Sequence, residues 1–150
     1  MSDARTWFEG FFEVAEPKLR HALVAALGQQ LGTEAASIAL AYGWEHRDRL
    51  RAMENPTGYL YRVGRTRVHS RRRERRFVDV PAHTVPAVEP GLPSALEKLS
   101  EKQRAAVMMV HADSWTRQEA AAALDISVSS LDTHLARGLE RFRSELGVTR

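Results

Sequence analysis

Residues 62–76, RVGRTRVHSRRRERR, form one strongly basic segment, because they hold eight arginines and one glutamate. The local charge is +7, and since the 150-residue chain carries +3, subtraction leaves −4 for the remainder. Such a segment favours a polyanionic partner, most often nucleic acid. The alternative is a solvated helix end whose arginines complement the helix dipole. Arginines placed around most of a helix suit phosphates better than bases. The predicted contacts are Arg62, Arg65, Arg67, Arg71, Arg72 and Arg73.

Residues 116–146 have the spacing of a helix-turn-helix. TRQE at 116–119 is a capping-box pattern that opens a short helix rich in alanine, and Ser127 caps a longer amphipathic helix after the turn LDIS. Short polar side chains point outward from the start of this second helix, where base edges would be reached. A plain helical hairpin is the alternative, and the arginine run favours DNA binding. The predicted contacts are Arg117, Ser129, Ser130, Asp132, Thr133, His134, Arg137 and Arg141.

Asp132 is an unexpected residue on a helix that faces a polyanion. It lies in the second helical turn, where the dipole benefit fades, and Leu135 and Ala136 offer it no ion pair within the helix. Its carboxylate could accept a hydrogen bond from the exocyclic amine of a cytosine. It could instead repel phosphate and so weaken binding to wrong sites. Repulsion requires no closely aimed approach, so the sequence favours the second explanation.

The sequence does not predict an enzyme. His111, Asp113 and Ser114 stand too close together to form a triad, whose members usually come from separate loops. No glycine-rich phosphate loop and no nucleophile elbow occur. Without cysteine there are no disulfides or thiolate metal sites, and the six histidines lack ligand-like pairing. We therefore expect no metal site and no cofactor.

Helical periodicity over nearly the whole chain predicts an all-α fold of two small domains. Helices are expected over 4–16, from Pro17 to Gly28, over 33–53, and from Pro56 into the arginine run. Four prolines in 77–93 predict an extended linker. The expected divisions are a first domain, 1–76, the linker, 77–93, and a helix-turn-helix domain, 94–150, in which Ser94 and SEKQ at 100–103 open helices.

The sequence also predicts where the protein resides. No run of 18 apolar residues exists, so no membrane span is expected. The start, MSDARTWFEGFFEV, lacks the basic and apolar segments of a signal peptide. The absence of cysteine suits the cytoplasm, which is the predicted location.

With these elements in order, the chain resembles an RNA polymerase sigma factor of the sigma-70 family, extracytoplasmic-function group. NPTGYLYRVGRTRVHSRRRER is similar to the family's promoter-melting domain, which has an aromatic-Leu-Tyr-Arg stretch followed by arginines. LSEKQRAAVMMVH and TRQEAAAALDISVSSLDTHLARGLERFRSEL resemble its upstream-element domain. The resemblance implies core RNA polymerase and promoter DNA as partners, with the chemistry left to polymerase. It also allows an anti-sigma protein as a partner.

The resemblance assigns two further sets of residues. Capture of the melted minus-ten strand would fall to Asn55, Tyr59 and Tyr61, since aromatic rings beside a basic helix can stack on unpaired bases, although such rings are as often core residues. Polymerase docking would fall to the helix over 34–50. Its charged side chains are Glu34, Glu45, Arg47 and Arg49.

Two departures from the family pattern leave other functions open. EAASIALAYGWEHRDRL has alanine where the family has carboxylates, and Thr66 stands where asparagine is usual. The main prediction is a sigma factor that directs promoter recognition and transcription initiation. The alternatives are a sigma-like helix-turn-helix regulator that no longer engages polymerase, and a helical adaptor that binds a protein partner.

Overall fold

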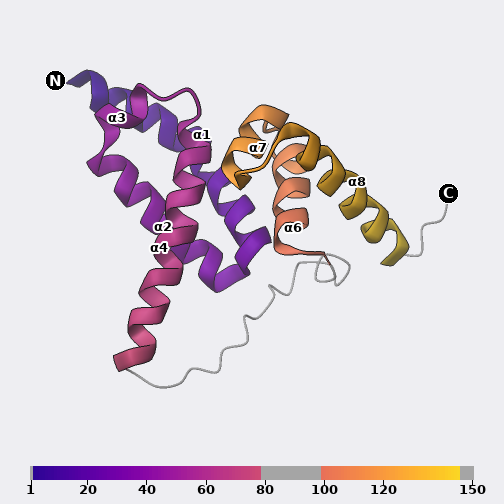
Figure 1. Cartoon of the computed structure of the whole chain (residues 1–150). Coiled ribbons are helices and arrows are strands. Elements are labelled where there is room, and N and C mark those ends of the chain that lie inside the picture. The colour runs from indigo at the N-terminus through magenta and orange to yellow at the C-terminus, as the bar shows by residue number, and fades with distance from the viewer. Residues whose placement is uncertain (1, 79–98, 146–150) are drawn as a thin grey trace.

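The computed structural model describes residues 2–78 and 99–145, which form helices and no strand (Figure 1). The predicted all-α fold is therefore confirmed. The part of the predicted linker from residue 79 on, and the helix start at Ser94, lie outside the described residues. None of the described helices combines the length and the hydropathy that crossing a membrane requires. The elements are α1 (Ser2–Leu27), α2 (Gln29–Glu45), α3 (Arg47–Arg51), α4 (Pro56–Val78), α6 (Glu101–Val107), the π-helical turn η1 (Met108–Ala112), α7 (Arg117–Leu124) and α8 (Val128–Glu145).

Helix α1 is longer than the sequence predicts, because it passes through Pro17 without a break. A proline inside a helix removes one hydrogen bond and costs about 3 kcal/mol. Burial on both sides of Pro17 offsets this cost, since Phe8 and Ala15 before it and Leu19 and Leu23 after it belong to the same apolar core. The prediction that Pro17 opens a new helix is wrong because packing overrides the local preference.

The helix predicted over 33–53 is instead two helices, α2 and α3, with His46 between them. Helix α2 begins directly after Gly28, so Gly32 lies inside it. A Cβ atom at Gly32 would stand 2.4 Å from the Cα atom of Val24 in α1. Likewise, a Cβ atom at Gly64 in α4 would stand 2.6 Å from the carbonyl oxygen of Ala35 in α2. Glycine at these two positions lets α1, α2 and α4 approach backbone to backbone.

The C-terminal helices begin where their caps predict. Ser100 Oγ accepts from the backbone N–H of Gln103 at 3.1 Å, and Thr116 Oγ1 accepts from that of Glu119 at 3.0 Å. In both cases the side chain of the later residue accepts from the backbone N–H of the cap, which completes the capping box. Both capping boxes read from the sequence are therefore confirmed, and they fix the starts of α6 and α7.

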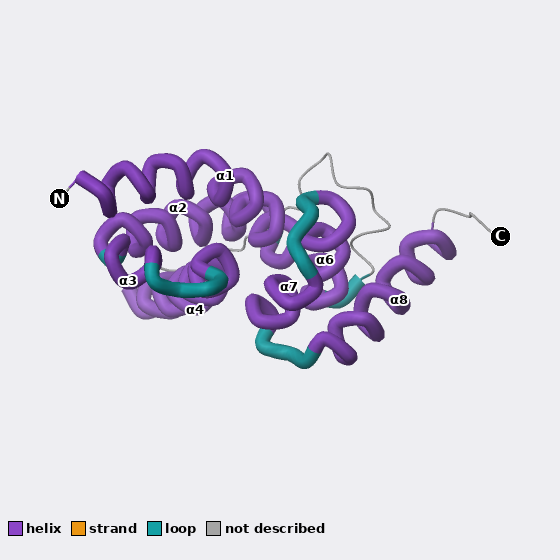
Figure 2. Tube along the Cα trace, turned by 90° about the horizontal axis from the view of Figure 1, so that it is seen from above, coloured by secondary structure: helices purple, strands orange, loops and turns teal. Residues whose placement is uncertain are grey.

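The N-terminal helices α1–α4 and the C-terminal helices α6–α8 pack directly against one another (Figure 2). A single cluster of buried residues runs from Phe8 to Leu135, and it contains residues of both groups of helices. Polar contacts also join the two groups: Arg104 donates to the carbonyl oxygens of Ala25 and Ala26, and His21 Nδ1 lies 3.1 Å from Asp113 Oδ2. The two groups of helices thus share one continuous core.

The close approach at Gly32 predicts the effect of adding one methyl group there. Gly32→Ala should lower the free energy of unfolding by about 1–3 kcal/mol, because α1 and α2 must move apart. Gly10→Ala is the matched control: nothing lies within 4 Å of its Cβ position, so helix propensity should raise stability by about 0.5–1 kcal/mol. Urea unfolding measures both, and equal effects of the two variants would contradict the close approach.

Candidate nucleic-acid interface

The helix-turn-helix is formed by α7, a three-residue turn and α8. Asp125 turns the chain with a left-handed backbone, φ 57°, a conformation that aspartate tolerates better than most residues. Ser127 Oγ then accepts from the backbone N–H of Ser130 at 3.0 Å and caps α8 as predicted. Leu131 and Leu135 of α8 are buried in the same apolar cluster as the alanines of α7. The local sequence therefore fixes where α7 and α8 begin and how the chain turns between them.

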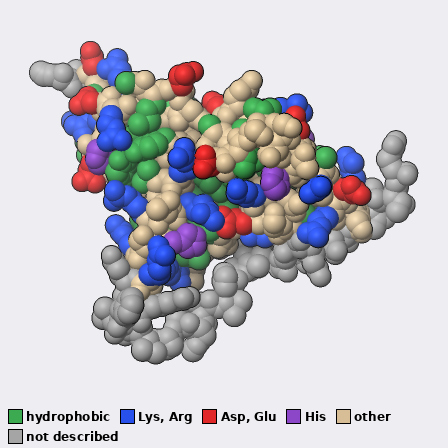
Figure 3. All heavy atoms as spheres, in the orientation of Figure 1, with side chains coloured by type: hydrophobic (Ala, Val, Ile, Leu, Met, Phe, Trp, Pro, Cys, Tyr) green, Lys and Arg blue, Asp and Glu red, His purple; other side chains and the backbone are tan. Residues whose placement is uncertain are grey.

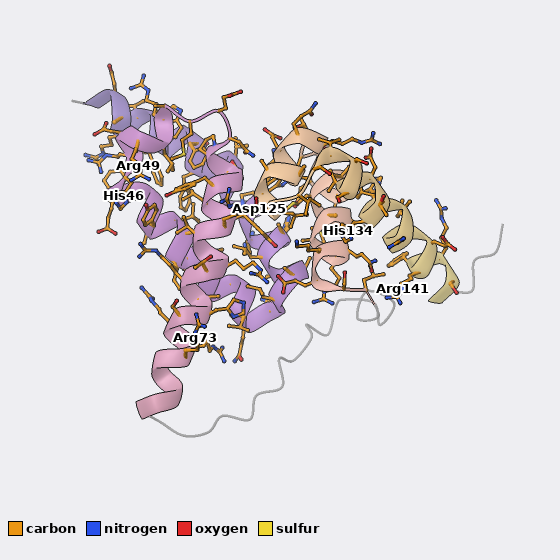
Figure 4. The ribbon with its side chains drawn as sticks, in the orientation of Figure 1. His46, Arg49, Arg73, Asp125, His134 and Arg141 are labelled. Carbon is orange, nitrogen blue, oxygen red and sulfur yellow. The ribbon has the colours of Figure 1, made fainter. Side chains whose placement is uncertain are left out.

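The predicted DNA-contacting side chains of α8 lie along its outer side. Ser129, Ser130, Thr133, Arg137 and Arg141 are exposed, while Asp132 and His134 are half-buried on its two flanks. Figure 4 labels His134 and Arg141, which project from the same helix. The arrangement puts short polar groups near the N-terminus of α8 and arginines further along it, which suits base edges and phosphates respectively.

Arg117 and Asp132 form an ion pair that the sequence did not predict. Arg117 is the first residue of α7, and its Nε lies 3.5 Å from Asp132 Oδ1 in α8. Neighbours three and four positions away on one helix are the only pairs that periodicity can reveal. This pair joins two helices, so only the helix-turn-helix geometry brings it together.

The arginines of α4 divide into two groups. Arg62, Arg67, Arg71 and Arg73 are exposed. Figure 3 shows several basic side chains on this face of the molecule, interspersed with His and acidic ones. Arg67 also lies over the ring of Tyr42, 4.7 Å from its centroid. The side chains of residues 74–78 of α4 are not among the described ones. This first group fits the predicted phosphate track.

Arg65 and Arg72 form the second group, because each faces an acid of the same chain. Arg65 Nε donates to Glu101 of α6, and this hydrogen bond raises the pKa of the guanidinium. Arg72 lies 3.9 Å from Glu34 of α2. These two arginines hold helices together, and the prediction that they contact DNA receives no support from their positions.

The aromatic residues predicted to capture a melted strand differ sharply in exposure. Tyr61 is 1% exposed, and burial raises the pKa of its hydroxyl. Its ring is part of the core, so its position in this arrangement does not support the prediction that it stacks on bases. Tyr59 is half-buried, and its hydroxyl lies 3.1 Å from that of Tyr42 and accepts from Arg49 at 3.2 Å. Of Tyr59 and Tyr61, only Tyr59 keeps part of its side chain at the surface.

Asn55 connects the two groups of helices. Its Oδ1 accepts from the backbone N–H of Gly58 at 3.0 Å and so caps α4. Its Nδ2 donates to the carbonyl oxygen of Glu119 in α7 at 3.1 Å. The amide group predicted to meet the minus-ten strand is therefore bound to the helix-turn-helix in this conformation.

The predicted polymerase-docking side chains are spread over α2 and α3. Glu34 is turned toward Arg72, whereas Glu45 and Arg49 are exposed. Arg47 lies 4.0 Å from the centre of the Trp44 ring and donates to the Trp44 carbonyl oxygen at 2.7 Å. Trp44 is itself 40% exposed. Glu45, Arg47, Arg49 and Trp44 thus form a mixed apolar and charged surface near α3, on the part of the molecule where Figure 4 labels His46 and Arg49.

No group of three or more histidine, aspartate or glutamate side chains that could hold a metal ion occurs among residues 2–78 and 99–145. The site consists of hydrogen-bonding and cationic groups, which suit a polyanion.

Comparison with known proteins gives two findings. Residues 91–142 match the family model described as sigma-70, region 4. The fold is similar to that of the sigma factor RpoE in complex with the anti-sigma factor NepR from Bartonella quintana, with a TM-score of 0.72, 20% identity and coverage of 100% of both chains. No curated protein matches the sequence. The family match covers α6, α7 and most of α8, and the structural likeness extends the fold to α1–α4.

The division of the arginines predicts the salt dependence of DNA binding. Arg71→Ala/Arg73→Ala should weaken binding to duplexes of any sequence and flatten the slope of log K against log salt by up to about two units, since each lost phosphate contact contributes about 0.9. Arg5→Ala/Arg51→Ala removes the same charge from exposed positions outside α4 and should leave the slope nearly unchanged. A change in base preference at constant slope would contradict the phosphate track.

Proposed function

We propose that this chain, whose residues 91–142 belong to sigma-70 region 4 and whose fold is that of a sigma factor, binds core RNA polymerase and directs it to promoters. The observation that carries the proposal is the helix-turn-helix of α7 and α8, capped and packed as a DNA-reading unit, in the same chain as the basic helix α4. In this role polymerase performs the chemistry, so the chain requires no catalytic group or cofactor. The protein acts in the cytoplasm, where its polymerase is.

The division of labour follows the two groups of helices. Residues 1–76 dock on polymerase and capture the melted minus-ten strand, residues 94–150 read the duplex minus-thirty-five element, and residues 77–93 link them. Exposed Arg62, Arg67, Arg71 and Arg73 support a phosphate track in the first part. The exposed polar face of α8 supports base reading in the second.

The arrangement of Asn55 supports a closed form that promoter binding must open. Its amide donates to the carbonyl oxygen of Glu119, so this donor meets a melted base only after its hydrogen bond to α7 breaks. The similar structure is a sigma factor held by an anti-sigma factor. We infer that a protein of this class is a further partner of the chain, because binding to the closed form would oppose promoter engagement.

The alternative of a regulator without polymerase rested on the alanines of α2. Ala35, Ala36 and Ala39 are buried where α2 meets α1 and α4. Close packing against Gly64, whose Cβ position lies 3.1 Å from the Cβ atom of Ala39, accounts for the small side chain at Ala39. Packing therefore explains the alanines, and their presence is no evidence that docking on polymerase is lost. A protein adaptor, the other alternative, would show no salt-dependent binding to duplex DNA.

Runoff transcription with core RNA polymerase on genomic fragments tests the function. The chain should produce transcripts from a small set of start sites, and polymerase alone should produce none from those sites. A chain that binds duplexes but never yields transcripts would support the regulator, and a chain that does neither would support the adaptor.

Polymerase docking has its own test. Reversing the charges of Glu45 and Arg49 together should weaken co-purification with core polymerase roughly tenfold, the size expected when about 1–2 kcal/mol of interface contacts is lost. Exchanging Arg5 and Glu9, an exposed pair 3.3 Å apart on α1, is the matched control and should bind normally. Unchanged binding of the Glu45 and Arg49 variant, with loss on deleting the second domain, would move the docking site to that domain.

A further inference from the structure

We propose that Asp132 reads a cytosine in the major groove, and that Arg117 neutralises and positions its carboxylate. The proposal rests on the proposed function in one respect, namely that α8 enters a duplex. It reverses the sequence-based preference for an acid that repels phosphate. The reason is the Arg117–Asp132 ion pair between α7 and α8.

The ion pair removes the charge that repulsion would need. Arg117 Nε lies 3.5 Å from Asp132 Oδ1, and the two side chains are 61% and 46% exposed. A phosphate that approaches this place meets a cation and an anion together, so their fields largely cancel beyond a few ångströms. Arg117 starts the first helix of the motif, which crosses the DNA backbone, so its guanidinium is also placed to meet a phosphate.

The carboxylate keeps one acceptor available beside this pair. Asp132 Oδ1 is buried and makes no hydrogen bond. The side chain as a whole is nearly half exposed, and we assign the role of the available acceptor to its other oxygen, Oδ2. A carboxylate held at one oxygen by a cation presents its other oxygen as an oriented acceptor.

Only cytosine offers a donor in the major groove with no acceptor beside it on the same base. The exocyclic N4 amine of cytosine donates in the major groove, whereas thymine O4 and guanine O6 and N7 are acceptors that repel a carboxylate. Adenine donates from N6 but carries the acceptor N7 beside it. The chemistry of Asp132 therefore selects cytosine.

The neighbours of Asp132 allow the close approach that its short side chain requires. Ser129 and Ala136 are three and four positions away on α8, and both are small and exposed. Thr133, the next residue, turns its hydroxyl back to the carbonyl oxygen of Ser129 at 3.3 Å. These small neighbours on α8 leave room for the short side chain of Asp132 to approach the base edges.

The test uses the full chain and a randomised duplex library. The enriched duplex is then varied by replacing each C·G pair with T·A in turn. The wild type should lose roughly 5- to 100-fold in affinity at one such position, the range of a single base contact. Asp132→Ala should become indifferent at that position and keep its other preferences. Asp125→Asn removes an exposed acid from the adjacent turn, keeps the left-handed backbone and should behave as the wild type.

Variants of Arg117 separate the two parts of the proposal. Arg117→Ala leaves Asp132 uncompensated, so it should weaken binding to all duplexes while the preference for C·G persists. Adding Asp132→Ala to Arg117→Ala should then strengthen binding to random duplexes. Circular dichroism establishes that each variant remains helical.

Three results would count against the proposal. If Asp132→Ala of the otherwise normal chain binds random duplexes more tightly and keeps every base preference, Asp132 is a repeller. If the wild type prefers a duplex but Asp132→Ala leaves all C·G positions unchanged, the reading role is wrong while the proposed function stands. If the wild type selects no duplex, α8 does not read DNA, and both the proposed reading by α8 and this inference are wrong.

Discussion

The fold depends on one arginine that completes the end of the first helix. A helix leaves its last carbonyl groups without partners, and burying them unbonded is costly. In α1, the carbonyl oxygen of Val24 accepts from Gly28, while Arg104 donates to Ala25 at 2.6 Å and Ala26 at 2.8 Å. The same guanidinium donates to the carbonyl oxygen of Leu99 at 2.6 Å. A cation from α6 therefore meets the negative end of the α1 dipole, and the buried end of α1 requires the C-terminal helices to be docked.

This docking sets the relation between stability and function. It brings α7 against α4, where Asn55 bonds to Glu119, and α6 against α4, where Arg65 bonds to Glu101. The groups proposed to act on promoter DNA are thus partly occupied by contacts within the chain. A partner that favours separated domains must offset these contacts with its own binding energy, whereas a partner of the closed form adds to them. The two kinds of partner therefore shift the equilibrium between docked and separated helices in opposite directions.

The sequence predicted the features that depend on neighbouring residues, such as helix caps. It did not predict the features that depend on tertiary contacts. The caps at Ser100, Thr116 and Ser127 depend on residues three positions away, so the sequence alone predicted them. The prediction that Pro17 opens a new helix was wrong, because the burial of both halves of α1 outweighs one lost hydrogen bond. Tyr59 and Tyr61 have similar sequence surroundings, yet a two-residue step on a helix turns the side chain through about 200°, which places Tyr61 in the core.

Acids that face the arginines of this chain have a common physical consequence. Glu101, Glu34 and Asp132 lie against Arg65, Arg72 and Arg117, each acid on a different helix from its arginine. An arginine that already faces a carboxylate attracts phosphate less, so it releases fewer counterions on binding and contributes less to affinity for arbitrary DNA. It is also held in one place, which favours a partner whose groups match that geometry. Pairing therefore lowers binding to DNA in general more than binding to the right sequence, and a strongly basic segment becomes compatible with selective recognition.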